Sequence, residues 1–145
     1  MSGDWQNVDY SLLGEEHVRR YRESGGADGY WWNGAPTLLL TTTGRRSGEL
    51  RTQPLIFGRD GDDLVVVASV GGMPKHPAWY LNLLADPHAS VELRADRFDV
   101  VARTVPDDEK LRLWRLMVEV WPNYATYQSR TDRVIPVVVL TPVTG

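Results

Sequence analysis

The chain has 145 residues, which is the length of one folded domain and too short for separate cofactor and substrate domains. Hydrophobic residues make up 42% and charged residues 24%, as in ordinary folded proteins, and no stretch approaches the roughly 18 apolar residues that a membrane span needs. The net charge of -3 argues against nucleic-acid binding, and the absence of cysteine excludes disulfides, thiolate metal sites and thiol catalysis.

The start of the chain and its histidines set further expectations. Residues 1–6 are polar and acidic, so no secretory signal is visible and a cytoplasmic location is the default. His17, His76 and His88 lack the close pairing on one helix face that indicates zinc, so no metal is expected. Peripheral membrane association stays open, as does the choice between a monomer and a homodimer.

The first part of the chain predicts one helix. Residues 11–24 have loosely periodic apolar positions and end at a Gly-Gly pair, which stops a helix. An aromatic run at residues 30–32 follows, and breakers occupy much of 33–36. We therefore expect residues 1–36 to form an N-terminal helix and a connecting loop.

From residue 37 onwards the pattern is typical of β-strands. Residues 37–43, 53–59 and 64–70 are rich in branched and aromatic side chains, and Asp60-Gly61 marks a hairpin between the second and third of these strands. Residues 90–94 and 98–105 alternate as a second hairpin.

Two more helices and a last strand complete the prediction. Residues 77–85 form a short helix that ends at Asp86-Pro87, and residues 107–121 form the clearest helix. Residues 134–140 are almost continuously apolar, which indicates a central strand or a subunit contact. Strands joined mostly by hairpins indicate an antiparallel barrel in an α+β fold. The predicted buried stripe of the long helix is Leu111, Trp114, Met117 or Val118, and Trp121.

The first candidate site is the segment from Thr41 to Arg51, where a strand runs into a turn that also contains Arg45, Arg46 and Ser47. Such a turn can present guanidinium groups, a hydroxyl group and free backbone N–H groups to a phosphate. A solvated hairpin with surface arginines is the alternative interpretation. Neither G-x-x-x-x-G-K-[ST] nor G-x-G-x-x-G occurs, which excludes the common nucleotide-binding loops.

The second candidate site runs from Ser69 to Asn82. A strand end meets a Gly-Gly loop, and a lysine and a helix N-terminus follow; both of these favour an anion or an electron-rich ring. In the alternative interpretation the glycines only turn the chain, Trp79 packs in the core, and His76 is a cap or surface residue.

The third candidate site follows the long helix, where Trp121, Tyr124 and Tyr127 are spaced three residues apart. If helical turns continue past Pro122, the three rings share one face. Core packing is the commoner use of such a stripe, but the rings can also wall a pocket and offer a phenolic proton donor. No catalytic triad, paired carboxylates or metal ligands compete, so we expect a bound cofactor to carry the chemistry.

Three strings in this order carry a family resemblance: L-T-T-T-G-R-R-S-G-x-x-R-x-x-P-L, A-S-x-G-G-x-x-K-x-P-x-W-Y-L-N-L-x-A-x-P and W-P-x-Y-x-x-Y-Q-x-x-T-x-R-x-I-P-V. The chain resembles the deazaflavin-dependent nitroreductase and quinone reductase family, which uses reduced coenzyme F-420 on a split β-barrel. The resemblance extends over residues 37–142. It implies an antiparallel, Greek-key-like split barrel of the FMN-binding type with flanking helices, in which residues 37–145 form the cofactor-binding domain.

The resemblance also implies roles for the three candidate sites. The arginine-bearing turn would hold the phosphate and the acidic glutamyl tail of F-420, and the second site would frame the deazaflavin ring. Ser69 and Tyr124 are the best candidates to polarise the acceptor or relay a proton. The implied catalytic residues are Ser69, Tyr124 and Tyr127, and the implied substrate wall is Trp121, Tyr124 and Tyr127. The implied cofactor-binding residues are Arg45, Arg46, Ser47, Arg51, Gln53, Pro54, Ser69, Val70, Gly71, Pro74, Lys75, His76, Pro77, Trp79 and Asn82.

The sequence departs from the family pattern at two positions. Val70 stands where a basic residue is familiar, and Trp121 stands where a tyrosine is familiar. The implied activity is transfer of a hydride from reduced F-420 to a planar electrophile such as a quinone, an enone or a nitro compound. Two alternatives stay open: an FMN-dependent oxidoreductase on the same barrel, and a non-catalytic deazaflavin carrier.

Overall fold

Antiparallel strands form one curled sheet in the computed structural model, which describes residues 14–69 and 75–143. The elements in chain order are α1 (Glu15–Glu23), β1 (Trp31–Trp32), β2 (Ala35–Thr43), β3 (Leu50–Ile56), β4 (Gly58–Asp60), β5 (Asp63–Val67), α2 (Ala78–Ala85), β6 (His88–Leu93), β7 (Asp96–Thr104), α3 (Asp107–Val120), α4 (Asn123–Ser129) and β8 (Val137–Pro142). Within these residues the sheet has eight strands in the order β1-β2-β6-β7-β8-β5-β4, and β3 pairs with β2 outside that path. The predicted α+β split barrel is confirmed.

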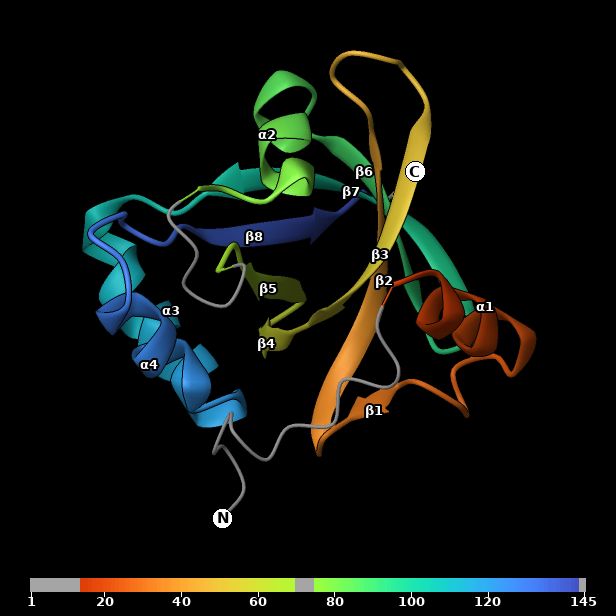
Figure 1. Cartoon of the computed structure of the whole chain (residues 1–145), viewed down its shortest axis with the longest axis horizontal. Helices are drawn as coiled ribbons and strands as arrows, with labels where there is room; N and C mark the ends of the chain where they lie inside the picture. The colour runs from red at the N-terminus through yellow and green to blue at the C-terminus, as the bar shows by residue number, and fades with distance from the viewer. Residues whose placement is uncertain (1–13, 70–74, 144–145) are drawn as a thin grey trace.

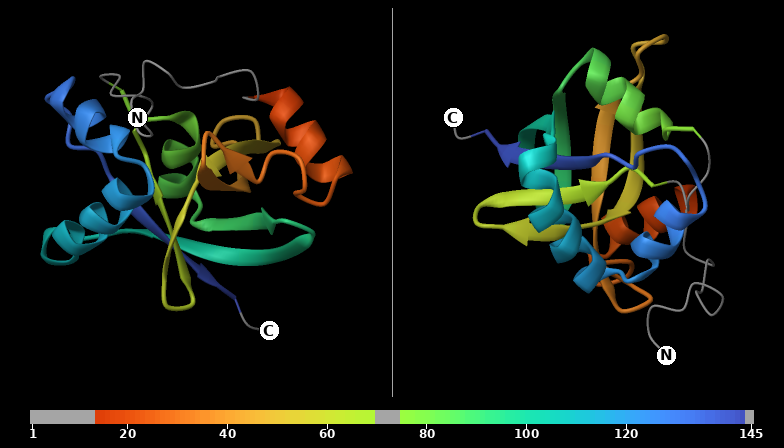
Figure 2. Two further views of the ribbon diagram at one scale, coloured as in Figure 1. Left: turned by 90° about the horizontal axis from the view of Figure 1, so that it is seen from below. Right: turned by 90° about the vertical axis from the view of Figure 1, so that its left-hand side faces the viewer.

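The helices cover the sheet on different sides. Figures 1 and 2 show α3 and α4 together on one side and α1 on the opposite side. α2 lies at the end of the sheet that is uppermost in Figure 1. In the described part of the chain, no helix combines the length and the apolar character that crossing a bilayer requires.

Strand β2 is central to the fold because it pairs along both edges. Its register with β3 runs from Thr37 opposite Ile56 to Thr43 opposite Leu50, so the arginine-bearing turn lies at the tip of this hairpin. β6 pairs along the other edge. The middle of β2 is fully buried, as its run of apolar and β-branched residues predicts.

The last strand is also central, as its apolar sequence predicts. β8 pairs with β5 on one side and with β7 on the other. Its predicted start at Val134 is wrong, because Val134 is 67% exposed and the strand begins at Val137. The N–H of Ile135 donates to the side chain of Gln128 at 3.0 Å instead of to a neighbouring strand, so pairing starts only beyond it.

The strand predicted over residues 53–59 is in fact two strands, β3 and β4, separated by Phe57. The N–H of Phe57 donates to the carbonyl of Pro36 at 3.1 Å, and the chain then leaves β2 to pair with β5. α3 passes very close to the chain here, since a Cβ atom at Gly58 would lie 2.6 Å from Cδ2 of Leu116. A glycine at the start of β4 therefore allows the helix to pack directly on the backbone.

Helix α3 is confirmed, but its buried face differs from the predicted stripe. Leu111 is 59% exposed, whereas Leu113 and Met117 are fully buried. These two residues lie four apart and therefore share one face of the helix. The Sδ atom of Met117 would be 2.7 Å from a Cβ at Gly58, so close packing at this glycine sets the rotation of the helix.

The other predicted elements are confirmed with small changes at their ends. The Asp60-Gly61 hairpin joins β4 to β5, the short helix is α2, and the second hairpin is β6 and β7. The first helix, predicted over residues 11–24, begins at Glu15 within the described residues. The connecting loop predicted up to residue 36 is in part strand, because β1 and the first residues of β2 pair with each other there.

Tyr21 joins α1 to the sheet through its hydroxyl group. The side chain is fully buried, and the hydroxyl donates to the carbonyl of Thr37 at 3.0 Å and accepts the N–H of Arg94 at 2.7 Å. Burial is the main cause that raises the pKa of Tyr21, so the group keeps its proton at neutral pH and can serve both bonds. α1 is thereby connected to β2 and to the turn between β6 and β7.

Replacing Tyr21 with Phe is expected to lower the free energy of unfolding by about 2 kcal/mol, because a buried carbonyl and a part-buried N–H lose their partner. Urea denaturation followed by tryptophan fluorescence measures the change. Tyr30→Phe is the matched control, since no described residue bonds to the Tyr30 hydroxyl, and a loss of about 0.5 kcal/mol or less is expected there. Equal losses in the two variants would show that the Tyr21 hydroxyl is not a structural bridge.

Candidate active site

Two adjoining pockets share Gln53 and Trp79 in their walls. The aromatic cavity, of about 430 Å³, is lined by Gly14, His17, Trp32, Thr37, Gln53, Pro54, Leu55, Ile56, Val67, Ser69, Pro77, Trp79, Trp121, Tyr124 and Tyr127. The arginine pocket, of about 560 Å³, is lined by Glu15, Gly44, Arg45, Arg46, Ser47, Leu50, Arg51, Thr52, Gln53, Ala78, Trp79 and Asn82. Because they share two walls, one elongated ligand can occupy both.

The turn between β2 and β3 presents four polar side chains to the arginine pocket. Arg45, Arg46, Ser47 and Arg51 are all exposed there. The backbone N–H groups of residues 44, 45, 48 and 49 already donate to protein oxygens at 2.7 to 3.1 Å. The prediction of free backbone N–H groups is therefore wrong for these residues, because the turn closes on itself and on α2. An anion would be held mainly by guanidinium groups and the Ser47 hydroxyl.

Asn82 connects this turn to α2. The side chain is 4% exposed, and its Oδ1 accepts two bonds from Arg45, one from the backbone N–H and one from Nη1, both at 3.1 Å. Its Nδ2 donates to Oγ1 of Thr42 at 3.1 Å. Asn82 lines the arginine pocket and not the aromatic cavity, so it lies beside the anion-binding groups and holds one of them in place.

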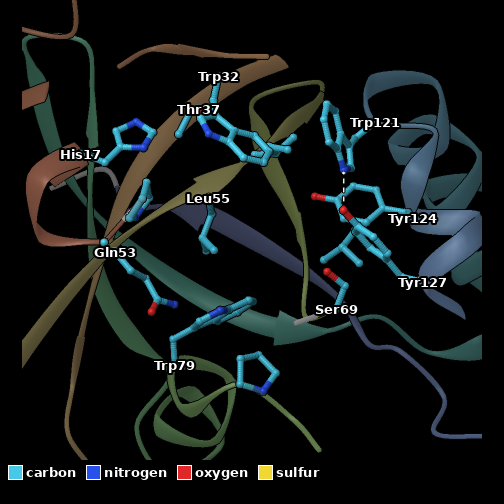
Figure 3. Close-up of a pocket in the computed structure, with 15 residues that line it drawn as sticks. His17, Trp32, Thr37, Gln53, Leu55, Ser69, Trp79, Trp121, Tyr124 and Tyr127 are labelled. Atoms are coloured by element: carbon cyan, nitrogen blue, oxygen red, sulfur yellow. Dashed lines mark hydrogen bonds between the residues drawn. The ribbon is translucent and has the colours of Figure 1, made fainter. Parts of the chain in front are cut away.

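The aromatic cavity has two distinct ends, which Figure 3 shows. Gln53 lies at one end, and the two tyrosines of α4 lie at the other. Trp79 lies on one side of the space and Trp32 on the opposite side. Because Gln53 and Trp79 also line the arginine pocket, the tyrosine end is the end farther from the cationic groups.

The tyrosine end is built by the segment that follows Pro122. The helix does not continue through Pro122: α3 ends at Val120, Trp121 is extended, and the separate helix α4 begins after the proline and carries Tyr124 and Tyr127. Trp121, Tyr124 and Tyr127 are at most 7% exposed, and all three line the cavity. The indole ring of Trp121 also packs against Trp32 at a centroid distance of 5.3 Å. The three rings therefore serve both as core and as pocket wall.

The hydroxyl groups of the two tyrosines have different surroundings. Tyr127 Oη accepts the indole N–H of Trp121 at 3.3 Å, and this N–H can only donate. No described residue bonds to the Tyr124 hydroxyl, which points into the cavity in Figure 3. Burial, with a smaller contribution from Tyr127, raises the pKa of Tyr124 well above its ordinary value. Tyr124 is therefore a protonated donor that faces the cavity.

Ser69 faces the same cavity just beyond the end of β5. Its side chain is 8% exposed, and the Ser69 carbonyl accepts Nη2 of Arg133 at 2.8 Å. The preceding carbonyl, of Ala68, accepts Nη1 of the same guanidinium at 3.0 Å. The segment that carries Ser69 is thus fixed from outside the cavity.

Most of the predicted site residues lie together, with two exceptions among those that the structure describes. Lys75 is exposed and lines neither pocket. His76 also lines neither pocket; its Nδ1 lies 2.9 Å from Nη1 of Arg133, and its ring packs against Tyr80 at 5.0 Å. Burial, and then the charge of Arg133, lowers the pKa of His76. The remaining predicted residues Val70, Gly71 and Pro74 lie outside the described residues.

Sequence reasoning missed the side of the site that α1 and β1 provide. His17 is fully buried in the cavity wall, with Nε2 2.7 Å from the carbonyl of Gly29. Glu15 lines the arginine pocket. Trp32 is 8% exposed and Trp31 60%, an alternation typical of a strand. This aromatic pair is a sequence signal that indicates β1 as part of the site, whereas the residues around His17 contain no such signal.

The two pockets fit a planar ring with an anionic tail. The aromatic cavity offers ring-sized space between indole groups, which suits a flat conjugated system. The arginine pocket offers three exposed guanidinium groups, which suit phosphate and carboxylate oxygens. The residues present therefore fit coenzyme F-420, with the deazaflavin ring in the cavity and the tail in the arginine pocket.

Comparison with known proteins leads to the same group of enzymes. The family model described as F420H(2)-dependent quinone reductase matches residues 13–142. An F420H(2)-dependent quinone reductase of Mycobacterium tuberculosis is 46% identical over 129 residues, which cover 86% of this chain and 87% of the relative.

Two solved structures are similar in both fold and sequence. An F420-H2 dependent reductase superposes with a TM-score of 0.67 at 43% identity, covering 72% of this chain and 93% of that chain. A protein described as a domain-swapped dimer superposes with a TM-score of 0.71 at 38% identity, covering 87% of this chain and 94% of that chain. The chain therefore belongs to the F420H(2)-dependent quinone reductase family, and it is a split-barrel oxidoreductase whose cofactor is coenzyme F-420.

Proposed function

We propose that the protein transfers a hydride from reduced F-420 to a quinone, and that it reduces quinones faster than enones or nitro compounds. The observation that carries this proposal is the Tyr124 hydroxyl, which faces the aromatic cavity without a partner among the described residues. A quinone offers a flat ring for the indole walls and a carbonyl oxygen for this donor. The family description names the same acceptor class.

The arginine pocket would hold the cofactor at its tail. Arg45 is preorganised by Asn82, and Arg51 is paired with Glu49 at 3.1 Å. Both members of that pair are exposed, so the pair is weak and a ligand phosphate or carboxylate can replace Glu49. We assign Arg45, Arg46, Ser47 and Arg51 to the tail, and Gln53 and Pro54 to the path between the two pockets.

The aromatic cavity would orient the reacting groups. When bound, reduced F-420 supplies a hydride from C5 of its deazaflavin ring. The indole rings of Trp79 and Trp32 bound the space in which the ring and the acceptor stack, and they exclude water from it. Tyr124 holds a proton at the acceptor oxygen, and Ser69 is a second polar group on the cavity wall. The hydride and one proton together convert a quinone to a hydroquinone.

Anaerobic assays of F-420 oxidation test the proposal. Reduced F-420 is mixed with the protein and with a quinone, an enone or a nitroaromatic compound, and the recovery of oxidised-cofactor absorbance gives the rate. We expect the quinone to react fastest. A faster nitroaromatic or enone would replace the proposed acceptor, and tight binding without turnover of any acceptor would favour a deazaflavin carrier. A parallel titration with FMN is expected to show much weaker binding than with F-420.

Replacing Tyr124 with Phe is expected to lower kcat/KM for the quinone about a hundredfold, because the acceptor oxygen loses its proton donor. The affinity for F-420 is expected to stay the same, since the lost hydroxyl lies at the end of the cavity away from the arginine pocket. Stopped-flow kinetics and a fluorescence titration measure the two effects. Tyr127→Phe is the matched control with a smaller expected loss, because the Tyr127 oxygen is already bonded to Trp121. A larger loss at Tyr127 would exchange the two roles.

Two further expectations concern the protein as a whole. Of the monomer and the homodimer that the sequence leaves open, we favour the homodimer, because a neighbour at 38% identity is described as a domain-swapped dimer. A cytoplasmic location is also proposed, since F-420-dependent reduction needs a supply of reduced cofactor. Light scattering and cell fractionation test these two expectations.

A further inference from the structure

A hydrogen-bond network centred on Arg133 lies outside the aromatic cavity and contacts residues of its wall. The guanidinium donates to the carbonyls of Ala68 and Ser69 at 3.0 and 2.8 Å, and Nη1 lies 2.9 Å from Nδ1 of His76. These partners are 57 to 65 residues away along the chain. One side chain therefore holds the end of β5 next to the segment that leads into α2.

The position of Arg133 is itself fixed from α4. The side-chain Nε2 of Gln128 donates to the carbonyl of Arg133 at 2.8 Å, and Oε1 of Gln128 accepts the N–H of Ile135 at 3.0 Å. Gln128 directly follows Tyr127 in α4. Hydrogen bonds therefore lead from the helix of the two cavity tyrosines, through Gln128 and Arg133, to the segment that carries Ser69.

The elements that this network joins form different parts of the wall of the aromatic cavity. α4 provides the tyrosine end, where we place the acceptor. The segment that follows β5 provides Ser69, and α2 provides Trp79, beside which we place the cofactor ring. Arg133 lines neither pocket, so any effect on the reaction must pass through the groups that it holds.

We propose that Arg133 is a positioning residue that sets the spacing between the cofactor ring and the acceptor. Hydride transfer depends steeply on this spacing, and a shift of about 1 Å can cost about a hundredfold in rate. A guanidinium suits the task, because its planar fork serves several acceptors in fixed directions, whereas a lysine ammonium is a compact charge on a flexible stem. The kinetic part of this proposal rests on the proposed function.

The pKa of His76 gives a second way to detect this hydrogen-bond network, independent of catalysis. Because Arg133 can only donate, Nδ1 of His76 must accept, so the proton of the neutral ring lies on Nε2. Burial is the larger cause that lowers the pKa of His76, and the positive charge of Arg133 is the smaller one. The other ring in contact is that of Tyr80. Loss of the guanidinium is therefore expected to raise the pKa of His76.

Substitution of Arg133 by Met and by Lys tests the proposal on the full chain. We expect Arg133→Met to lower kcat for quinone reduction about tenfold or more, while the Kd for F-420 changes by about twofold or less, because the tail groups are untouched. Arg133→Lys is expected to recover part of kcat. Arg115→Met is the matched control, since Arg115 is exposed on α3 and lines neither pocket, and it is expected to keep the wild-type kcat.

A second variant and a second measurement make the test decisive. If Arg133→Met does not fold, Gln128→Met removes the support of Arg133 from α4 and is expected to give a smaller drop in kcat at unchanged Kd.

NMR titration of the imidazole signals is expected to show a raised pKa of His76 in Arg133→Met relative to Arg115→Met, and a smaller change in Arg133→Lys, which keeps the positive charge. An unchanged kcat with an unchanged His76 titration overturns the proposal, and so does a Kd that rises as kcat falls. If the wild-type protein reduces no quinone, the proposed function fails, and the His76 titration still decides whether the network exists.

Discussion

Simultaneous replacement of Arg45, Arg46 and Arg51 by Ala is expected to weaken the binding of F-420 about a hundredfold or more, because the anionic tail loses its charge-assisted hydrogen bonds. The three side chains are exposed and line one pocket, so their loss leaves the core intact. The variant is also expected to bind with a flatter dependence on salt, since fewer charges remain to be screened. Fluorescence titration at low and high ionic strength measures both effects.

Two control proteins separate charge from geometry in this experiment. Arg97→Ala combined with Arg115→Ala removes positive charge elsewhere on the surface and is expected to leave the affinity nearly unchanged. Lys at positions 45, 46 and 51 keeps the charge but not the planar fork, and an intermediate affinity is expected. Undiminished affinity in the triple Ala variant would show that the tail binds elsewhere.

Replacement of Gly26 by Ala is expected to destabilise the protein by about 3 kcal/mol, because two costs act together. The backbone at Gly26 has a φ of +87°, which is unfavourable for any residue with a Cβ atom. The new Cβ would also lie 2.5 Å from the Cα of Arg94, a backbone atom that cannot move aside. Urea denaturation measures the loss.

Gly34→Ala is a closely matched control for this steric effect. Gly34 has a φ of +83°, and nothing lies within 4 Å of the position where its Cβ would be. Only the conformational cost remains, so a loss of about 1 kcal/mol is expected. Equal losses at the two glycines would show that the loop after α1 does not pack closely against the β6–β7 turn. A larger loss at Gly26 would confirm that this contact seats α1, which carries His17 in the cavity wall.

The strands and helices could be predicted where local pattern decides them. β2 is a run of apolar and β-branched residues, and α3 has a proline and acids at its start, so both were predicted with nearly correct ends. The rotation of α3 could not be predicted, because it depends on Gly58, which is distant in the sequence and lets Leu116 and Met117 pack on the backbone of β4. Local periodicity contains no information about such a contact.

In the candidate site, too, features set by local sequence could be predicted, and features set by contacts between distant residues could not. The spacing of Trp121, Tyr124 and Tyr127 was a local signal, and the structure places all three in one cavity wall. The bond between Asn82 and Arg45 was not predictable, since 37 residues separate them and only the packing of α2 against β2 brings them together. His17 was missed for the same reason.

Gln53 and Trp79 line both pockets and lie between the groups suited to bind the cofactor tail and the groups suited to bind the acceptor. The groups suited to retaining the cofactor lie on the β2–β3 hairpin and α2, whereas most of the rings that would meet the acceptor come from α4 and β1. If the proposed function holds, substitutions at Tyr124 and Tyr127 are expected to change the preference for the acceptor more than the affinity for the anionic tail of the coenzyme, because the tail groups lie in the other pocket. Acceptor preference could then be varied by engineering while the tail-binding hairpin is left unchanged.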